Sequence, residues 1–85
     1  MALAAAQDTK YFLELAKDAG AADPFVAFLN GQGVTTAEDY ALTATSEGDL
    51  KDLITAAEAG AVTFPKLSDR VAVKKLWHAC KMLIN

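Results

Sequence analysis

The chain has 85 residues, of which 53% are hydrophobic and 22% charged, and its formal net charge is −3. This hydrophobic content excludes a disordered chain, and the length allows one domain that buries roughly 60–65% of its unfolded surface. The acidic balance argues against general nucleic-acid binding by the whole domain. We expect a single helical domain over residues 1–85, with an N-terminal helix over about 8–19 and a core bundle over about 23–82.

The first predicted helix covers the sequence DTKYFLELAKDAG, and Gly20 ends it. Its apolar residues recur at helical spacing, and its charged residues occupy the other side. The apolar positions are Tyr11, Phe12, Leu15 and Ala19.

The second predicted helix is short and covers DPFVAFLN, with glycines following at 31 and 33. Asp23 is placed to cap it, and Pro24 suits the first helical position because a missing N–H costs nothing there. Phe25, Phe28 and Leu29 form its apolar face.

The third predicted helix lies in VTTAEDYALTA, where Thr35 and Glu38 stand at capping-box spacing. Tyr40, Ala41 and Ala44 are expected to face the core, with Leu42 on a flank.

The fourth predicted helix lies in SEGDLKDLITAAEAG, where Ser46 and Asp49 repeat the capping logic and Gly60 ends the helix. Its apolar stripe consists of Leu50, Leu53, Ile54 and Ala57.

A connector leads to the fifth and longest predicted helix. Pro65 forces Phe64 out of helical geometry, and we expect Val62, Phe64 and Leu67 to tuck into the core. Ser68 is the predicted cap of the closing helix. The apolar face of this helix is Val73, Leu76, Trp77, Cys80, Leu83 and Ile84, and its opposite face carries Arg70, Lys74, His78 and Lys81, with Lys75 alongside. These periodicities predict an all-α fold, a compact five-helix bundle with a long C-terminal helix.

The order of these elements resembles the sterile alpha motif (SAM) family. Ser46, Asp49, Leu50, Leu53 and Ile54 match the fourth-helix pattern of that family, and LSDRV at 67–71 stands where its last helix begins. The resemblance covers roughly residues 25–81 and implies a SAM-like bundle. It also implies an acidic middle region that contacts the start of the last helix of another copy. A death-domain-type bundle is another all-α architecture, for which this chain is short.

Charge divides unevenly along the chain. Residues 1–60 hold ten acidic and three basic residues, a balance of −7, whereas residues 61–85 hold one acidic and five basic residues, a balance of +4. Two copies could therefore dock head to tail through different surfaces. The predicted acidic side is Glu38, Asp39, Glu47, Asp49 and Asp52, and the predicted basic side is Arg70, Lys74 and Lys75, turned outward and unpaired.

These observations predict a protein–protein interaction module whose partner is another protein or a second copy of the chain. Acids near helix starts and bases in a last helix also follow from the helix dipole alone, and the sequence does not separate the two explanations. RNA binding by the basic last helix is the alternative, because some SAM relatives hold RNA hairpins in this way. The net charge and the absence of aromatic residues among these bases argue against it.

Catalysis, cofactors and membranes are not expected. Adjacent carboxylates such as Glu38 and Asp39 are typical of helix caps, and no catalytic set, phosphate loop or metal-ligand spacing occurs. The single Cys80 excludes an internal disulfide framework and a Cys-based zinc site, and the single His78 excludes a multi-histidine metal site. Cys80 is interpreted as a buried apolar group. No run of about 18 apolar residues is present, so we expect no membrane contact. No secretory signal is present, so we expect an intracellular location, cytoplasmic or nuclear. No small-molecule substrate is evident from the sequence.

Overall fold

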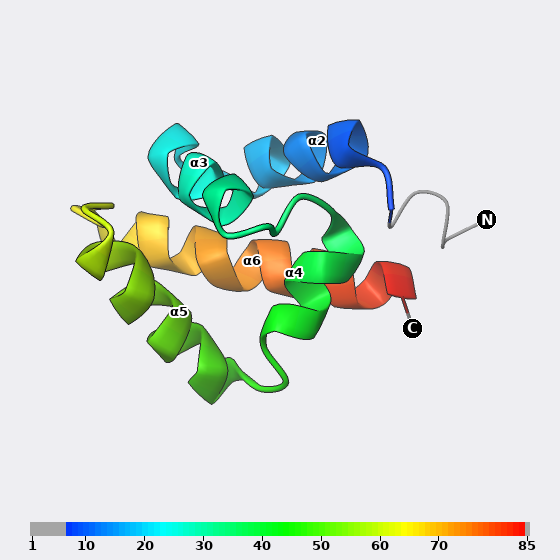
Figure 1. Ribbon diagram of the computed structural model, residues 1–85. Helices are drawn as coiled ribbons and strands as arrows, with labels where there is room; N and C mark the ends of the chain where they lie inside the picture. The colour runs from blue at the N-terminus through cyan, green and yellow to red at the C-terminus, as the bar shows by residue number, and fades with distance from the viewer. Residues whose placement is uncertain (1–6, 85) are drawn as a thin grey trace.

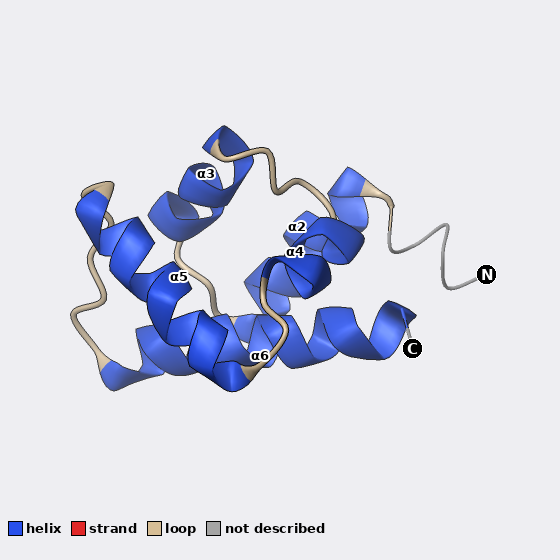
Figure 2. Cartoon of the chain, turned by 60° about the horizontal axis from the view of Figure 1, so that its bottom comes forward, coloured by secondary structure: helices blue, strands red, loops and turns tan. Residues whose placement is uncertain are grey.

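The computed structural model describes residues 7–84, and this span folds into five α-helices joined by short loops (Figures 1 and 2). The all-α prediction is therefore confirmed for the described residues, and residues 1–6 and 85 of the predicted domain lie outside them. The helices are α2 (Thr9–Ala19), α3 (Asp23–Gly31), α4 (Ala37–Thr43), α5 (Glu47–Ala59) and α6 (Leu67–Ile84).

The long helix α6 is the element around which the others pack. It crosses the whole molecule in Figure 1, with α2 and α3 along one side and α5 diverging from it on the other. Helices α2, α4 and α5 all contact α6, and α2 also contacts α4. Because Phe12 and Ala16 of α2 are buried, this helix contributes to the same core as the four helices that follow it.

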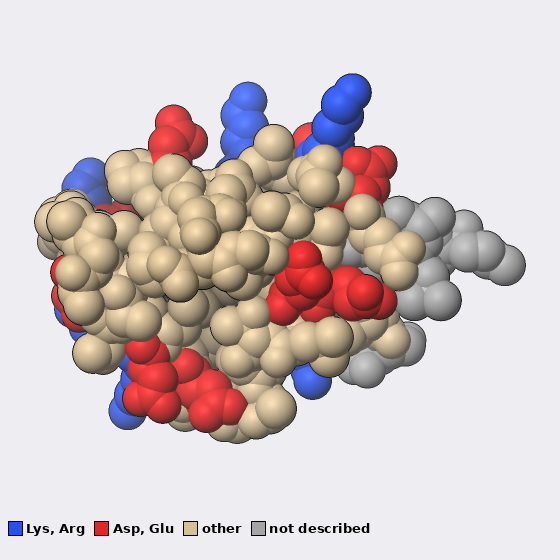
Figure 3. All heavy atoms as spheres, in the orientation of Figure 1, with Lys and Arg blue, Asp and Glu red and all other residues tan. Residues whose placement is uncertain are grey.

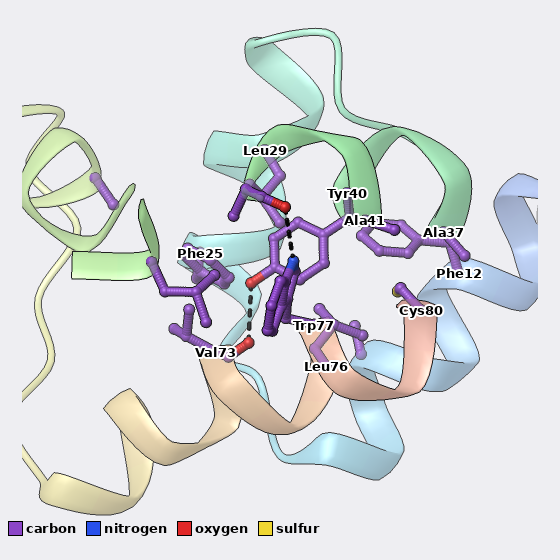
Figure 4. Close-up of a cluster of buried hydrophobic side chains, with 14 of the residues drawn as sticks. Phe12, Phe25, Leu29, Ala37, Tyr40, Ala41, Val73, Leu76, Trp77 and Cys80 are labelled. Carbon is purple, nitrogen blue, oxygen red and sulfur yellow. Dashed lines mark hydrogen bonds between the residues drawn. The ribbon is translucent and has the colours of Figure 1, made fainter. Parts of the chain in front are cut away.

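Aromatic side chains and one stripe of α6 form the core (Figure 4). The ring of Tyr40 packs on those of Phe12 and Phe25, with centroid separations of 5.9 and 6.4 Å. Phe25 in turn meets Phe64 of the connector at 5.8 Å. Tyr40, Ala41 and Ala44 of the α4 segment face inward as predicted, and α6 contributes Val73, Leu76, Trp77 and Cys80.

Two buried hydrogen bonds join α4 to α6 within this core. The Tyr40 hydroxyl donates to the carbonyl oxygen of Val73 at 3.0 Å, and the Trp77 indole Nε1–H donates to the carbonyl oxygen of Ala44 at 3.2 Å (Figure 4). Buried polar groups of this kind need a partner, since an unpaired one costs free energy. Trp77 thus anchors α6 in the core, as predicted, and also binds the end of α4.

The predicted caps of α3 and α4 are each displaced by one residue. Ala22, not Asp23, precedes α3, because the carbonyl oxygen of Ala22 accepts the first helical hydrogen bonds. Thr36, not Thr35, caps α4, and its Oγ1 accepts from the Asp39 N–H at 3.2 Å. The Asp39 carboxylate accepts from the Thr35 N–H at 3.4 Å. Asp39, rather than the predicted Glu38, is therefore the acidic residue that accepts a backbone hydrogen bond at the start of α4.

The starts of α5 and α6 also differ from the prediction. Ser46 occupies the cap position of α5, but its hydroxyl makes no capping bond. Helix α6 begins at Leu67 rather than after Ser68, and the Asp69 carboxylate accepts from the Lys66 N–H at 2.9 Å. Leu67 lies on the first turn with 82% of its surface exposed, so its predicted place in the core is wrong.

Candidate protein-binding surface

The five predicted acidic residues do not form one continuous face. Among the Asp and Glu atoms visible in Figure 3, one cluster lies over α4 and another over α5, with uncharged atoms between these clusters. Glu38 and Asp39 belong to α4, and Asp49 and Asp52 share one side of α5 because they are three residues apart. Glu47 starts α5 on the side that faces α6.

Two of these carboxylates accept hydrogen bonds from residues just before their own helices. Asp39 accepts from Thr35 through Oδ2, and Asp49 accepts through Oδ2 from both the N–H and the hydroxyl of Thr45, at 2.9 and 2.7 Å. The hydroxyl of Thr45, followed by its backbone N–H, lowers the pKa of Asp49 below its ordinary value. Asp49 therefore stays ionised at neutral pH, and both of its bonds from Thr45 go to the same oxygen, Oδ2.

Two of the three predicted cations are paired with carboxylates of α5. Arg70 Nη2 lies 3.6 Å from Glu58 Oε2, and Lys74 Nζ lies 3.1 Å from Glu47 Oε1. Lys75 is exposed and has no carboxylate partner within residues 7–84. Arg70 and Lys74 do face outward, with about half of each side chain exposed, but the prediction that they are unpaired is wrong, since the crossing of α5 and α6 brings acids of one helix beside bases of the other.

Two polar residues in the second half of α6 lie beside Trp77. Lys81 Nζ lies 5.3 Å from the Trp77 ring centroid, and the His78 ring meets the indole at 5.1 Å in an edge-on arrangement. A cation over an indole face is weakly stabilised there. Lys81 is therefore directed toward its own chain rather than toward a partner.

The described surface also carries a groove between α5 and α6, which the sequence did not predict. Its volume is about 640 Å³. Its apolar lining is Leu50, Ile54, Leu67 and Val71, and its charged rim is Glu47, Lys51, Arg70 and Lys74. Leu67 and Val71 are four residues apart on the exposed side of α6, and this spacing was the signal available in the sequence.

Cys80 and His78 of α6 do not form a pair in the described structure. Cys80 is fully buried, and burial raises the pKa of its thiol to about 12, so it is protonated and unreactive at neutral pH. His78, two residues away, is exposed on another side of α6. Residues 7–84 bring together no three His, Cys, Asp or Glu side chains that could hold a metal ion. None of the described helices is long and apolar enough to cross a bilayer.

Comparison with known families, with curated proteins and with solved structures found no match. The resemblance to SAM domains therefore stays a prediction from the residue pattern. We infer function below from the surface chemistry alone.

Proposed function

We propose that this chain is a protein–protein interaction module that self-associates head to tail. The acidic residues of α4 and α5 in one copy contact the first half of α6 in the next. The observation that carries this proposal is the separation of charge between elements, −7 over residues 1–60 and +4 over residues 61–85. A contact between two different surfaces is heterologous, so it leaves one surface of each kind free at the ends and can propagate.

The intramolecular ion pairs are weak enough to be exchanged on docking. The side chains of Arg70, Glu58, Lys74 and Glu47 are all about half exposed. Exposed pairs of this kind contribute about 0–1 kcal/mol, because water screens them and two long side chains lose conformational freedom. A partner's carboxylate can therefore replace one in the same chain at little cost, and opposite charges speed the encounter of the two copies.

Several carboxylates of the acidic residues are free to meet a partner. Glu38 and Asp52 accept no hydrogen bond and form no ion pair with the described residues. Asp39 and Asp49 each use Oδ2 for capping, and neither carboxylate forms an ion pair with a described residue. The carboxylates on α4 and α5 can thus bind lysine or arginine without unfolding a helix start.

Charge reversal tests the proposal by sedimentation velocity. Asp52→Lys and Lys75→Glu change exposed residues that have no partner in the described structure, whereas a change at Asp49 would also remove a cap. Each single reversal should weaken association. Mixing the two variants should leave one intact contact and stop growth at dimers.

Lys10→Glu on α2 is the matched control, because it makes the same change of charge on an exposed residue outside both surfaces. It should associate as the wild type does. Equal weakening by Lys10→Glu and Lys75→Glu would mean that net charge, not the α6 surface, governs association, and would contradict the proposal.

RNA binding by α6 is supported less well. Arg70 and Lys74 each lie beside a carboxylate of α5, and Lys81 lies over Trp77, so the phosphate-binding capacity of this helix is reduced. A fluorescence titration with a generic RNA hairpin at two salt concentrations tests this alternative. Binding that falls steeply with salt would favour it.

A further inference from the structure

We propose that the groove between α5 and α6 receives Leu42 of a second copy of this chain. This inference rests on the proposed head-to-tail association and names the apolar contact at its centre. The charge pattern alone steers two copies together but gives little affinity, so a stable contact needs buried apolar surface as well.

The groove offers an apolar floor that the chain itself leaves open. Leu67 is 82% exposed and Val71 46% exposed on the first two turns of α6, and Ile54 of α5 is half-buried beside them. Clustered apolar side chains framed by charged residues are typical of protein-binding surfaces. The groove is lined by three cations, Lys51, Arg70 and Lys74, and one carboxylate, Glu47. With Glu58, the partner of Arg70, counted as well, the charge around the groove is +1.

Leu42 has the complementary chemistry. It is 67% exposed, although its neighbours Tyr40 and Ala41 in the same helix are buried. Glu38 and Asp39 precede it by four and three residues, so both carboxylates lie on the same side of α4 as Leu42. The outward side of α4 therefore presents one apolar side chain flanked by negative charge, which fits an apolar groove with a positive rim.

The occupant of the groove comes from another copy. Leu42 does not line the groove of its own chain, which is formed by α5 and α6 only. Each copy therefore carries one Leu42 surface and one groove, on different elements. Insertion of Leu42 into the next copy would place Glu38 and Asp39 beside the cations of the rim, and would repeat along a row of copies.

Three substitutions test this inference by sedimentation equilibrium at low salt. Leu42→Ser removes the inserted side chain, Leu67→Ser removes part of the groove floor, and Met82→Ser is the control. Met82 is 80% exposed on α6 and does not line the groove. Loss of one buried leucine should weaken association at least about tenfold in the first two variants. Met82→Ser should stay within about twofold of the wild type.

Mixing Leu42→Ser with Leu67→Ser is the sharper measurement, because a heterodimer can form only if both variants are folded. Leu42→Ser keeps an intact groove and Leu67→Ser keeps an intact Leu42, so the mixture should form heterodimers with the affinity of the wild type. If Leu42→Ser associates as strongly as the wild type while Asp52→Lys and Lys75→Glu associate more weakly, the groove contact is overturned and the proposed function still stands. Weakening by Leu42→Ser but not by Leu67→Ser would place Leu42 elsewhere and also overturn it. A wild-type chain that stays monomeric would overturn both proposals.

Discussion

The Tyr40 hydroxyl lies 3.0 Å from the carbonyl oxygen of Val73 and joins the middle of α4 to the middle of α6 inside the core. The bond from Trp77 to the end of α4 acts beside it. Together they fix α4 on α6. They therefore also fix where the exposed side of α4, with Leu42, lies relative to the basic side of α6.

Removing the Tyr40 hydroxyl should destabilise the fold without unfolding it. Tyr40→Phe loses one buried hydrogen bond and should lower the free energy of unfolding by about 1 kcal/mol in urea titrations. The cost stays moderate because the Val73 carbonyl keeps its bond within α6. Tyr11→Phe is the control, since the hydroxyl of this half-buried tyrosine has no hydrogen bond to a described residue. Equal stability of Tyr40→Phe and Tyr11→Phe would contradict the role of this bond.

Alkaline pH should destabilise the protein through its buried thiol. Burial raises the pKa of Cys80 from 9.0 to about 12. In the unfolded chain the thiol loses its proton near pH 9, whereas in the folded protein it keeps the proton up to about pH 12. The contribution of the thiol to stability is therefore complete below pH 9 and is lost between pH 9 and 12. The free energy of unfolding should fall by at most about 1.4 kcal/mol per pH unit from this group. Burial raises the pKa of Tyr40 as well, so Tyr40 adds to the fall above pH 10.

The control for the alkaline effect is Cys80→Ala. This variant should be less stable at pH 7, because it leaves a small cavity, but its stability should depend less on pH above 9. Identical alkaline slopes for the wild type and Cys80→Ala would show that the thiol is not the titrating group.

Acid should act through Asp49 at the start of α5. The hydroxyl and N–H of Thr45 lower the pKa of this carboxylate from 3.8, so its contribution is present above pH 3.8 and is lost as pH falls through the lowered value. Thr45→Val removes the strongest of these bonds. It should lower the melting temperature at pH 7 and reduce its further fall in acid. Asp52 lies on the same side of α5 but has no such bonds, so Asp52→Asn should change neither the melting temperature at pH 7 nor its fall in acid.

The pair between Lys74 and Glu47 should contribute little to stability. Its atoms are 3.1 Å apart, but both side chains are about half exposed, so a double-mutant cycle with Lys74→Met and Glu47→Gln should give a coupling below about 1 kcal/mol. Lys75→Met provides the baseline for a neighbouring lysine without a partner. A coupling above about 2 kcal/mol would mean that Lys74 holds α5 against α6 and is not available to another copy.

The helices could be predicted from the sequence because their apolar residues recur at helical spacing. Gly20, for example, ends α2 in the left-handed conformation with φ 84°, which glycine adopts without strain. The exact cap of α4 could not be predicted, since TTAED offers two threonines that each precede an acid by three residues. In the structure, the bonds from the Tyr40 N–H to the Thr36 carbonyl oxygen and from the Asp39 N–H to Thr36 Oγ1 identify Thr36 as the cap.

The binding surface could be predicted only in part. The identity of the charged residues is visible in the sequence, but the pairing of Arg70 with Glu58 and of Lys74 with Glu47 depends on how α5 and α6 cross. The sequence predicts Leu67 in the core as the last apolar residue of an extended connector. The helix begins at Leu67 itself, so this side chain faces outward and forms part of the groove.

The average mass of the wild-type chain, measured by sedimentation equilibrium over a wide range of concentrations at low salt, tests self-association most directly. We predict that the mass rises continuously with concentration, passes that of a dimer, and falls when salt is added. A mass that equals one chain at every concentration would contradict head-to-tail association.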